Sequence, residues 1–254
     1  MSQSSSKIVG LMIFIIVVSV LFFIALMPAK KHGSARIKSL AISGNHLLSE
    51  NSYLNFAKLS NVQNSAEISL PVVKDRLEKH PFIASTEVEI SKYGSAKVQM
   101  YEKELIAILI IDDESFLLSA ELQLLPVFYN TKFVDLPIIN NPKYGRKYRV
   151  LDYLNSEEII EAYNILSVIK NLNEEMLKKL SEINLNNGND ISLTFSGIHP
   201  LIKFGRNSIP KKILTLNSIW NEIKNNDNEL SRSEYVDLRF KNQIYLGKVA
   251  ETEL

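Results

Sequence analysis

The sequence contains no cysteine among its 254 residues. The absence of thiols excludes a disulfide framework and every metal site that depends on thiolate ligands. The chain also lacks an excess of charge of either sign, because its formal net charge at pH 7 is +1 and its isoelectric point is about 7.8. Balanced charge without a basic stripe gives no reason to expect nucleic acid as a partner.

The sequence also lacks a catalytic or cofactor-binding pattern. It has no glycine-rich phosphate loop and no serine nucleophile elbow. Adjacent carboxylates at 112–114 are typical of a solvated turn. We interpret the four dispersed histidines as surface or boundary residues rather than metal ligands: His32, His46, His80 and His199. We therefore predict a protein that has no enzymatic activity and binds no cofactor, metal or small-molecule substrate.

One long apolar run lies near the N-terminus. Residues 8–27 contain no charged side chain, and about 20 apolar residues are what an α-helix needs to cross the hydrocarbon core of a membrane. We predict a short tail at 1–7 and a transmembrane helix at 8–28, ended by Pro28. The alternative is a cleaved signal peptide, which would have a shorter apolar core of about 7–15 residues followed by a small-residue cleavage site.

Residues 36–104 have the pattern of a small α+β domain. We predict a strand, two helices and two further strands in that order, at 37–42, 49–59, 71–80, 83–90 and 96–102. Two helices that cover one face of a small sheet would bury the apolar side chains of these elements. We predict the last strand as a free edge of this sheet, with Ala96, Val98 and Met100 as a candidate contact surface.

Residues 105–249 are richer in strands, and residues 250–254 would form a C-terminal tail. Apolar runs at 105–111 and 116–125 predict two strands. Residues 136–139 predict a short edge strand, because Pro137 cannot donate a hydrogen bond to a neighbour. The predicted class of the whole chain is therefore α+β, with a mostly antiparallel β domain in its second half.

The second half of the chain also contains sequence signals for two helix starts and a hairpin turn. Asn155 and Glu158 have the spacing of a capping box at a helix start, and Pro210 marks the start of a later helix. The Asn187-Gly188 pair predicts a hairpin turn between two short strands.

The final predicted strand, from Tyr235 onward, has two interpretations. In the first, it is a half-buried terminal strand, and an ion pair between Asp237 and Arg239 stabilises it by less than about 1 kcal/mol. Alternatively, residues 240–246 are an exposed edge that accepts a strand from a partner protein. The candidate partner-binding residues are Tyr235, Phe240, Asn242, Ile244, Tyr245 and Leu246.

Several motifs give the chain a resemblance to the FtsQ/DivIB family of bacterial cell-division proteins. The first strand ends in Ile-Ser-Gly-Asn at 42–45, a Leu-Pro-Ile-Ile segment occupies 136–139, and residues 235–240 read Tyr-Val-Asp-Leu-Arg-Phe. The strand-helix-helix-strand-strand order of 36–104 is similar to the POTRA domain of that family. The turn at 92–94 and Leu105 depart from the residues usual in the family, which indicates a divergent member.

The resemblance implies a scaffold of the bacterial division machinery with one membrane span in the inner membrane. Its N-terminus would lie in the cytoplasm and its POTRA domain (36–104) and β domain (105–249) in the periplasm, at the division septum. The flanking charges alone favour the opposite orientation, since one lysine precedes the apolar run and four cations follow it: Lys7, then Lys30, Lys31, Arg36 and Lys38.

The resemblance also implies the partners. In the family, the C-terminal strand region binds small coiled-coil proteins, FtsB with FtsL, and the POTRA domain contacts other septal proteins. Two other classes of function remain open. A POTRA-type chaperone for outer-membrane or exported proteins would normally have tandem POTRA units or a membrane barrel. An envelope enzyme would need a solvent cleft with paired titrating groups.

Overall fold

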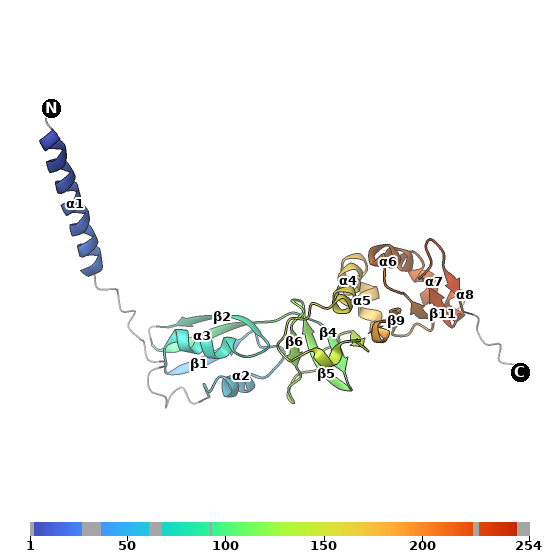
Figure 1. Ribbon diagram of the computed structural model, residues 1–254. Coiled ribbons are helices and arrows are strands. Elements are labelled where there is room, and N and C mark those ends of the chain that lie inside the picture. The colour runs from blue at the N-terminus through green and yellow to red at the C-terminus, as the bar shows by residue number, and fades with distance from the viewer. Residues whose placement is uncertain (1–2, 27–36, 61–67, 92, 226–228, 248–254) are drawn as a thin grey trace, which may run out of the picture.

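The computed structural model describes residues 3–26, 37–60, 68–91, 93–225 and 229–247. An N-terminal helix, a small sheet with two helices, and a large sheet with five helices follow one another along an elongated molecule (Figure 1). The predicted C-terminal tail at 250–254 lies outside the described residues, as do Lys30, Lys31 and Arg36.

The N-terminal helix, α1 (Gln3–Leu26), exposes the apolar side chains from Met12 to Phe23. Among the described residues, no helix combines the length and the apolar character needed to cross a membrane. The transmembrane helix predicted at 8–28 is therefore wrong.

The small sheet contains three strands in the order β1-β3-β2, with β1 parallel and β2 antiparallel to β3. Two helices supply side chains to its core, Tyr53 from α2 and Leu77 from α3. The predicted order of these five elements is confirmed: β1 (Ser39–Ser43), α2 (Glu50–Phe56), α3 (Leu70–Glu78), β2 (Ile83–Ile90) and β3 (Ser95–Glu102).

The free edge predicted for this sheet is wrong. β3 lies between β1 and β2 and pairs with both, and the side chains of Ala96, Val98 and Met100 are buried. Alternation of apolar residues indicates which face of a strand is buried, but it does not indicate which strand lies at the edge. The open edges belong to β1 and β2.

The large sheet has nine strands in the order β12-β11-β10-β9-β8-β7-β4-β5-β6. Most of its pairings are antiparallel, and β4–β7, β7–β8 and β10–β11 are parallel. The strands are β4 (Leu105–Ile111), β5 (Glu114–Ser119), β6 (Leu124–Pro126), β7 (Ile138–Asn140), β8 (Leu180–Asn184), β9 (Ser192–Phe195), β10 (Leu201–Lys203), β11 (Tyr235–Asp237) and β12 (Tyr245–Leu246).

The strand predicted as an edge piece at 136–139 lies inside the sheet. β7 pairs with β4 on one side and β8 on the other. Pro137 stands just before the strand, so its missing N–H removes no ladder bond, and its carbonyl accepts a hydrogen bond from Ile108 N–H at 2.9 Å.

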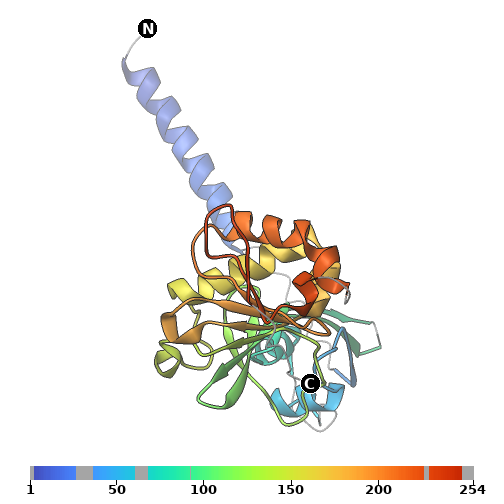
Figure 2. The ribbon, with the colours of Figure 1, turned by 90° about the vertical axis from the view of Figure 1, so that its right-hand side faces the viewer.

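Helices cover one face of the large sheet (Figures 1 and 2). Their inner side chains form one core with the strands, including Ile159 and Ile165 of α4 and Ile213 and Leu216 of α6. The helices are α4 (Glu157–Leu172), α5 (Glu174–Lys179), α6 (Ile209–Ser218), α7 (Trp220–Lys224) and α8 (Glu229–Arg232), and short 3-10 turns occupy η2 (Gly145–Lys147) and η3 (Asn186–Gly188).

The start of α4 differs from the predicted capping box. Its N-cap is Ser156, whose side chain makes no capping hydrogen bond. The Glu158 carboxylate does not turn back to the helix start. It accepts hydrogen bonds from the backbone N–H groups of Lys143 at 2.9 Å and Tyr144 at 3.2 Å, so a tertiary contact replaces the local one.

Candidate protein-binding surfaces

The C-terminal strand β12 lies at one end of the large sheet. It pairs with β11, with Val236 opposite Leu246, and the N–H of Gly247 donates to the carbonyl of Tyr235 at 2.9 Å. In an antiparallel ladder with this pattern, the N–H and C=O of Leu246 point away from β11. No strand among the described residues covers them, so β12 offers backbone groups to an added strand.

The six predicted partner-binding residues divide into two sets. Phe240, Asn242 and Tyr245 are exposed, and the rings of Phe240 and Tyr245 meet edge to face with centroids 4.9 Å apart. Tyr235, Ile244 and Leu246 are partly buried. The structure thus brings an aromatic pair to the rim of the free edge, while the other apolar side chains support the strand from behind.

The predicted strand from Tyr235 ends earlier than expected. β11 stops at Asp237, and the chain turns through Asn242, which has a φ of 59°, before it returns as β12. Asp237 is buried and accepts hydrogen bonds from the backbone N–H and the guanidinium of Arg239. These hydrogen bonds between Asp237 and Arg239 hold the chain in a local turn. The turn takes the chain out of the extended conformation and ends the strand.

A basic cavity of about 410 Å³ opens beside Phe240. Its cations come from three segments: Arg206, Lys211, Lys212, Arg239 and Lys241. Asp190 is the one carboxylate among the described residues that line it, and it pairs with Arg239 at 2.9 Å. The cavity therefore carries an excess of positive charge next to the free edge, and we call it the basic pocket.

Hydrogen bonding and burial shift the pKa of two cations in the basic pocket. Hydrogen bonds to Asp237 and Asp190 raise the pKa of Arg239. Partial burial lowers the pKa of Lys212, whose ammonium donates to the carbonyl of Phe204 at 2.7 Å. Sequence reasoning missed this pocket because its residues meet only through the parallel pairing of β10 and β11. The one local signal was the Lys-Lys pair just after Pro210.

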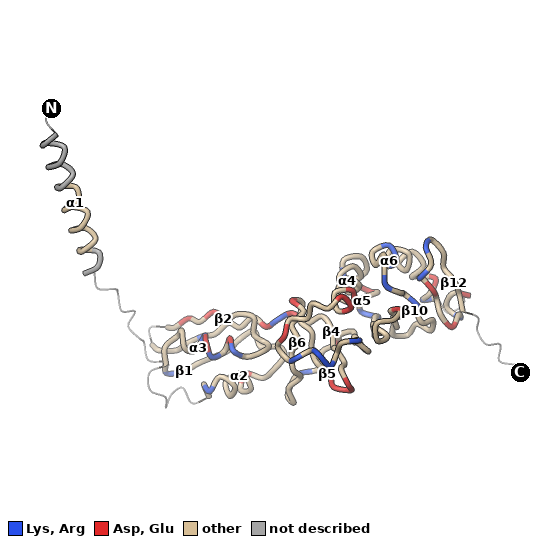
Figure 3. Tube along the Cα trace, viewed as in Figure 1, with Lys and Arg blue, Asp and Glu red and all other residues tan. Residues whose placement is uncertain are grey.

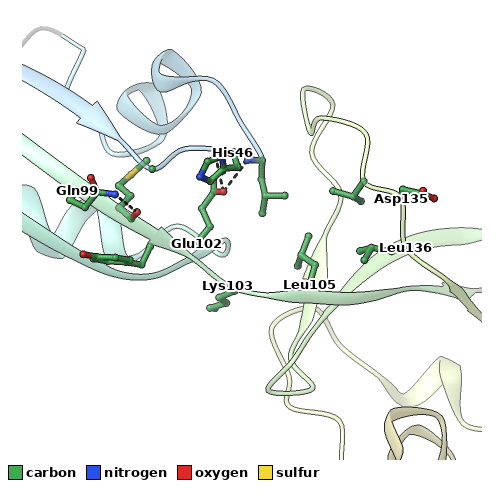
Figure 4. A pocket seen from close by; sticks show the side chains of 12 residues that line it. His46, Gln99, Glu102, Lys103, Leu105, Asp135 and Leu136 are labelled. Carbon is green, nitrogen blue, oxygen red and sulfur yellow. Dashed lines mark hydrogen bonds between the residues drawn. The ribbon is translucent and has the colours of Figure 1, made fainter. Parts of the chain in front are cut away.

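A second cavity, of about 570 Å³, lies where β3 passes into β4 (Figure 4). The Glu102 carboxylate beside it accepts hydrogen bonds from the N–H groups of His46 and Leu47 and from the hydroxyl of Tyr53. Burial and this carboxylate raise the pKa of Tyr53. Glu102 therefore serves to fix the turn before α2 and is not a free acid or base.

The titratable residues singled out in the sequence are not brought together. His80, which we expected at the inner face of its helix or at a boundary, is buried, and its Nδ1 accepts the N–H of Phe82 at 3.1 Å. Asp112 forms an exposed ion pair with Arg146 at 3.0 Å. Within the described ranges, no three His, Asp or Glu side chains are grouped so that they could hold a metal ion.

Comparison with known proteins gives a match to the part of the chain that contains the large sheet. The family model for the C-terminal region of cell division protein FtsQ/DivIB matches residues 107–239, and no curated protein matches the sequence. The matched residues run from β4 through β11 to Arg239, so they include most of the large sheet and most of the basic pocket. Because this match covers more than half of the chain, the protein belongs to the FtsQ/DivIB family of cell division proteins.

Proposed function

We propose that this protein is a non-enzymatic scaffold in bacterial cell division that acts at the septum through protein–protein contacts. In this proposal residues 36–104 form a POTRA domain and residues 105–249 a β domain. The partner is a short coiled-coil division protein of the FtsB or FtsL kind, which adds a strand to β12. The observation that carries the proposal is the free edge of β12 beside an exposed aromatic pair.

Three features of this edge support strand addition. The outward N–H and C=O of Leu246 supply main-chain hydrogen bonds, which give affinity without sequence preference. Phe240 and Tyr245, each about half exposed at 52% and 48%, supply apolar area that is lost to water on binding. The basic pocket beside them suits an acidic side chain of the same partner.

The test compares two exposed tyrosines on different sheets. In cells, Tyr245→Glu should abolish co-purification of the coiled-coil partners, because a charge on the edge opposes strand addition. Ile244→Glu should act in the same way. Tyr93→Glu is the control, since Tyr93 is 86% exposed and lies in the turn between β2 and β3 of the small sheet, away from β12. Normal co-purification by a folded Tyr245→Glu protein would show that β12 is not the docking edge.

A further inference from the structure

Four cations occur within seven residues in the loop after β7. Residues 142–149, which we call the basic loop, read Pro-Lys-Tyr-Gly-Arg-Lys-Tyr-Arg. The cations of this loop are all exposed: Lys143, Arg146, Lys147 and Arg149. Figure 3 shows them as a blue stretch beside β5. The family resemblance and the C-terminal edge account for none of these residues.

Hydrogen bonds to Glu158 and close packing at Gly145 hold the backbone of the basic loop in place. The buried carboxylate of Glu158 accepts the N–H groups of Lys143 and Tyr144 and also the hydroxyl of Tyr148, at 3.0 Å. Gly145 is buried, and a Cβ added there would lie 3.0 Å from the Ile111 side chain. The loop is therefore preorganised, so that a ligand would not have to order the backbone.

The positive charge of the basic loop is mostly uncompensated. Asp112 pairs with Arg146, whereas Lys143, Lys147 and Arg149 have no carboxylate partner among the described residues. The ammonium groups of Lys143 and Lys147 lie 5.2 and 4.8 Å from the centre of the same Tyr144 ring. Two like charges are thus held against one aromatic ring, an arrangement that an anionic ligand would stabilise.

A chain of contacts joins the basic loop to the basic pocket. The N–H of Asn187 donates to the carbonyl of Asn141 at 2.9 Å, and Gly188 lies against the Lys143 side chain. Arg206, which lines the basic pocket, donates to the carbonyl of Asn189 at 2.8 Å. Three strand spacings separate β7 from β10, so the positive surface extends about 15 Å along this end of the sheet.

The surroundings of the basic loop favour a polypeptide as the ligand. Exposed apolar side chains follow it directly, at Val150, Leu151 and Tyr153. The neighbouring turn at 112–114 carries three exposed carboxylates, of which Asp112 pairs with Arg146 of the loop. These carboxylates would repel a continuous anionic surface such as a lipid bilayer. A polypeptide can instead place its acidic residues opposite the cations and its apolar residues opposite 150–153.

We propose that the basic loop binds an extended segment of acidic and apolar residues in a partner polypeptide, and that it lengthens the docking surface that begins at β12. This inference rests on the proposed function for the identity of the partner. The chemistry of recognition is separate from strand addition, because it depends on Lys143, Lys147 and Arg149 and not on the backbone of β12.

The test uses the full-length protein and a labelled ten-residue peptide of alternating glutamate and leucine. Fluorescence anisotropy measures its dissociation constant at physiological ionic strength. The triple variant Lys143→Gln, Lys147→Gln, Arg149→Gln should weaken binding at least fivefold. The matched variant Lys74→Gln, Lys79→Gln, Lys97→Gln removes the same charge from the small-sheet region and should change binding less than twofold. A peptide of alternating glutamine and leucine should not bind the wild-type protein.

Two outcomes would overturn the inference. Equal weakening by both triple variants would mean that the peptide responds only to net charge. Binding to phosphatidylglycerol vesicles through the same three cations, without binding of the acidic peptide, would assign the loop to a lipid surface. Tyr245→Glu separates this inference from the proposed function, because it should retain most of the peptide affinity while it abolishes co-purification of the coiled-coil partners.

Discussion

The imidazole ring of His80 lies 5.2 Å from the ring of Phe128. His80 follows α3 beside the small sheet, whereas Phe128 follows β6 of the large sheet. Phe82 also meets Phe128 edge to face at 5.2 Å, and Leu117 and Leu125 of the large sheet belong to the same buried core. The two sheets therefore share a core.

Removal of the Phe128 ring should destabilise the protein by about 2 kcal/mol, because Phe128 is half-buried against two aromatic rings. The matched control is Phe133→Ala in the same loop, where the ring is 91% exposed and the expected loss is below about 0.5 kcal/mol. Urea unfolding measures both values. Similar losses for the two variants would show that the shared core does not hold the sheets together.

Stability should fall as pH decreases from about 6.5 to about 4. Burial and the nearby charge of Lys103 lower the pKa of His80 from 6.5 to about 4. The unfolded chain therefore binds a proton in this window that the folded protein does not bind, and protonation favours unfolding by about 3 kcal/mol. His80→Gln should flatten the pH dependence of the unfolding free energy between pH 6.5 and 4. An unchanged slope in His80→Gln would contradict this assignment.

Gly44→Ala should destabilise the protein much more than Gly197→Ala. Both glycines have a positive φ, +83° and +71°, which costs an alanine about 1 kcal/mol in either place. A Cβ at Gly44 would also lie 2.1 Å from the Met100 carbonyl oxygen, whereas nothing lies within 4 Å of a Cβ at Gly197. Gly44→Ala should therefore lower the thermal unfolding temperature more than Gly197→Ala does. Equal decreases would mean that the contact with β3 relaxes easily.

Much of the secondary structure could be predicted from the sequence, because the spacing of apolar residues and the positions of proline and glycine are local signals. Pro71 and Pro210 mark the starts of α3 and α6. Alternation at 96–100 correctly marks the buried face of β3. The position of a strand within its sheet is not local, and for this reason β3 and β7 were both wrongly assigned to edges.

The candidate sites were only partly predictable. The C-terminal segment could be singled out from its alternating pattern and from the Tyr-Val-Asp-Leu-Arg-Phe run at 235–240, and the structure then places Phe240 and Tyr245 at the surface. The basic pocket could not, since Arg206 and Arg239 are far apart in the sequence and are brought to one cavity by the parallel pairing of β10 and β11. The contact between Glu158 and the backbone N–H of Lys143 could not be predicted either. Its place in a capping-box pattern suggested a hydrogen bond to the start of its own helix instead.

Complementation in cells depleted of the native protein tests most directly whether the edge of β12 binds the partner. Tyr245→Glu and Tyr93→Glu are expressed at equal levels, and cell length and partner recruitment to the septum are measured. We expect long filaments without partner recruitment for Tyr245→Glu and normal division for Tyr93→Glu. Normal division and recruitment in Tyr245→Glu cells would contradict the claim that the edge of β12 binds the partner.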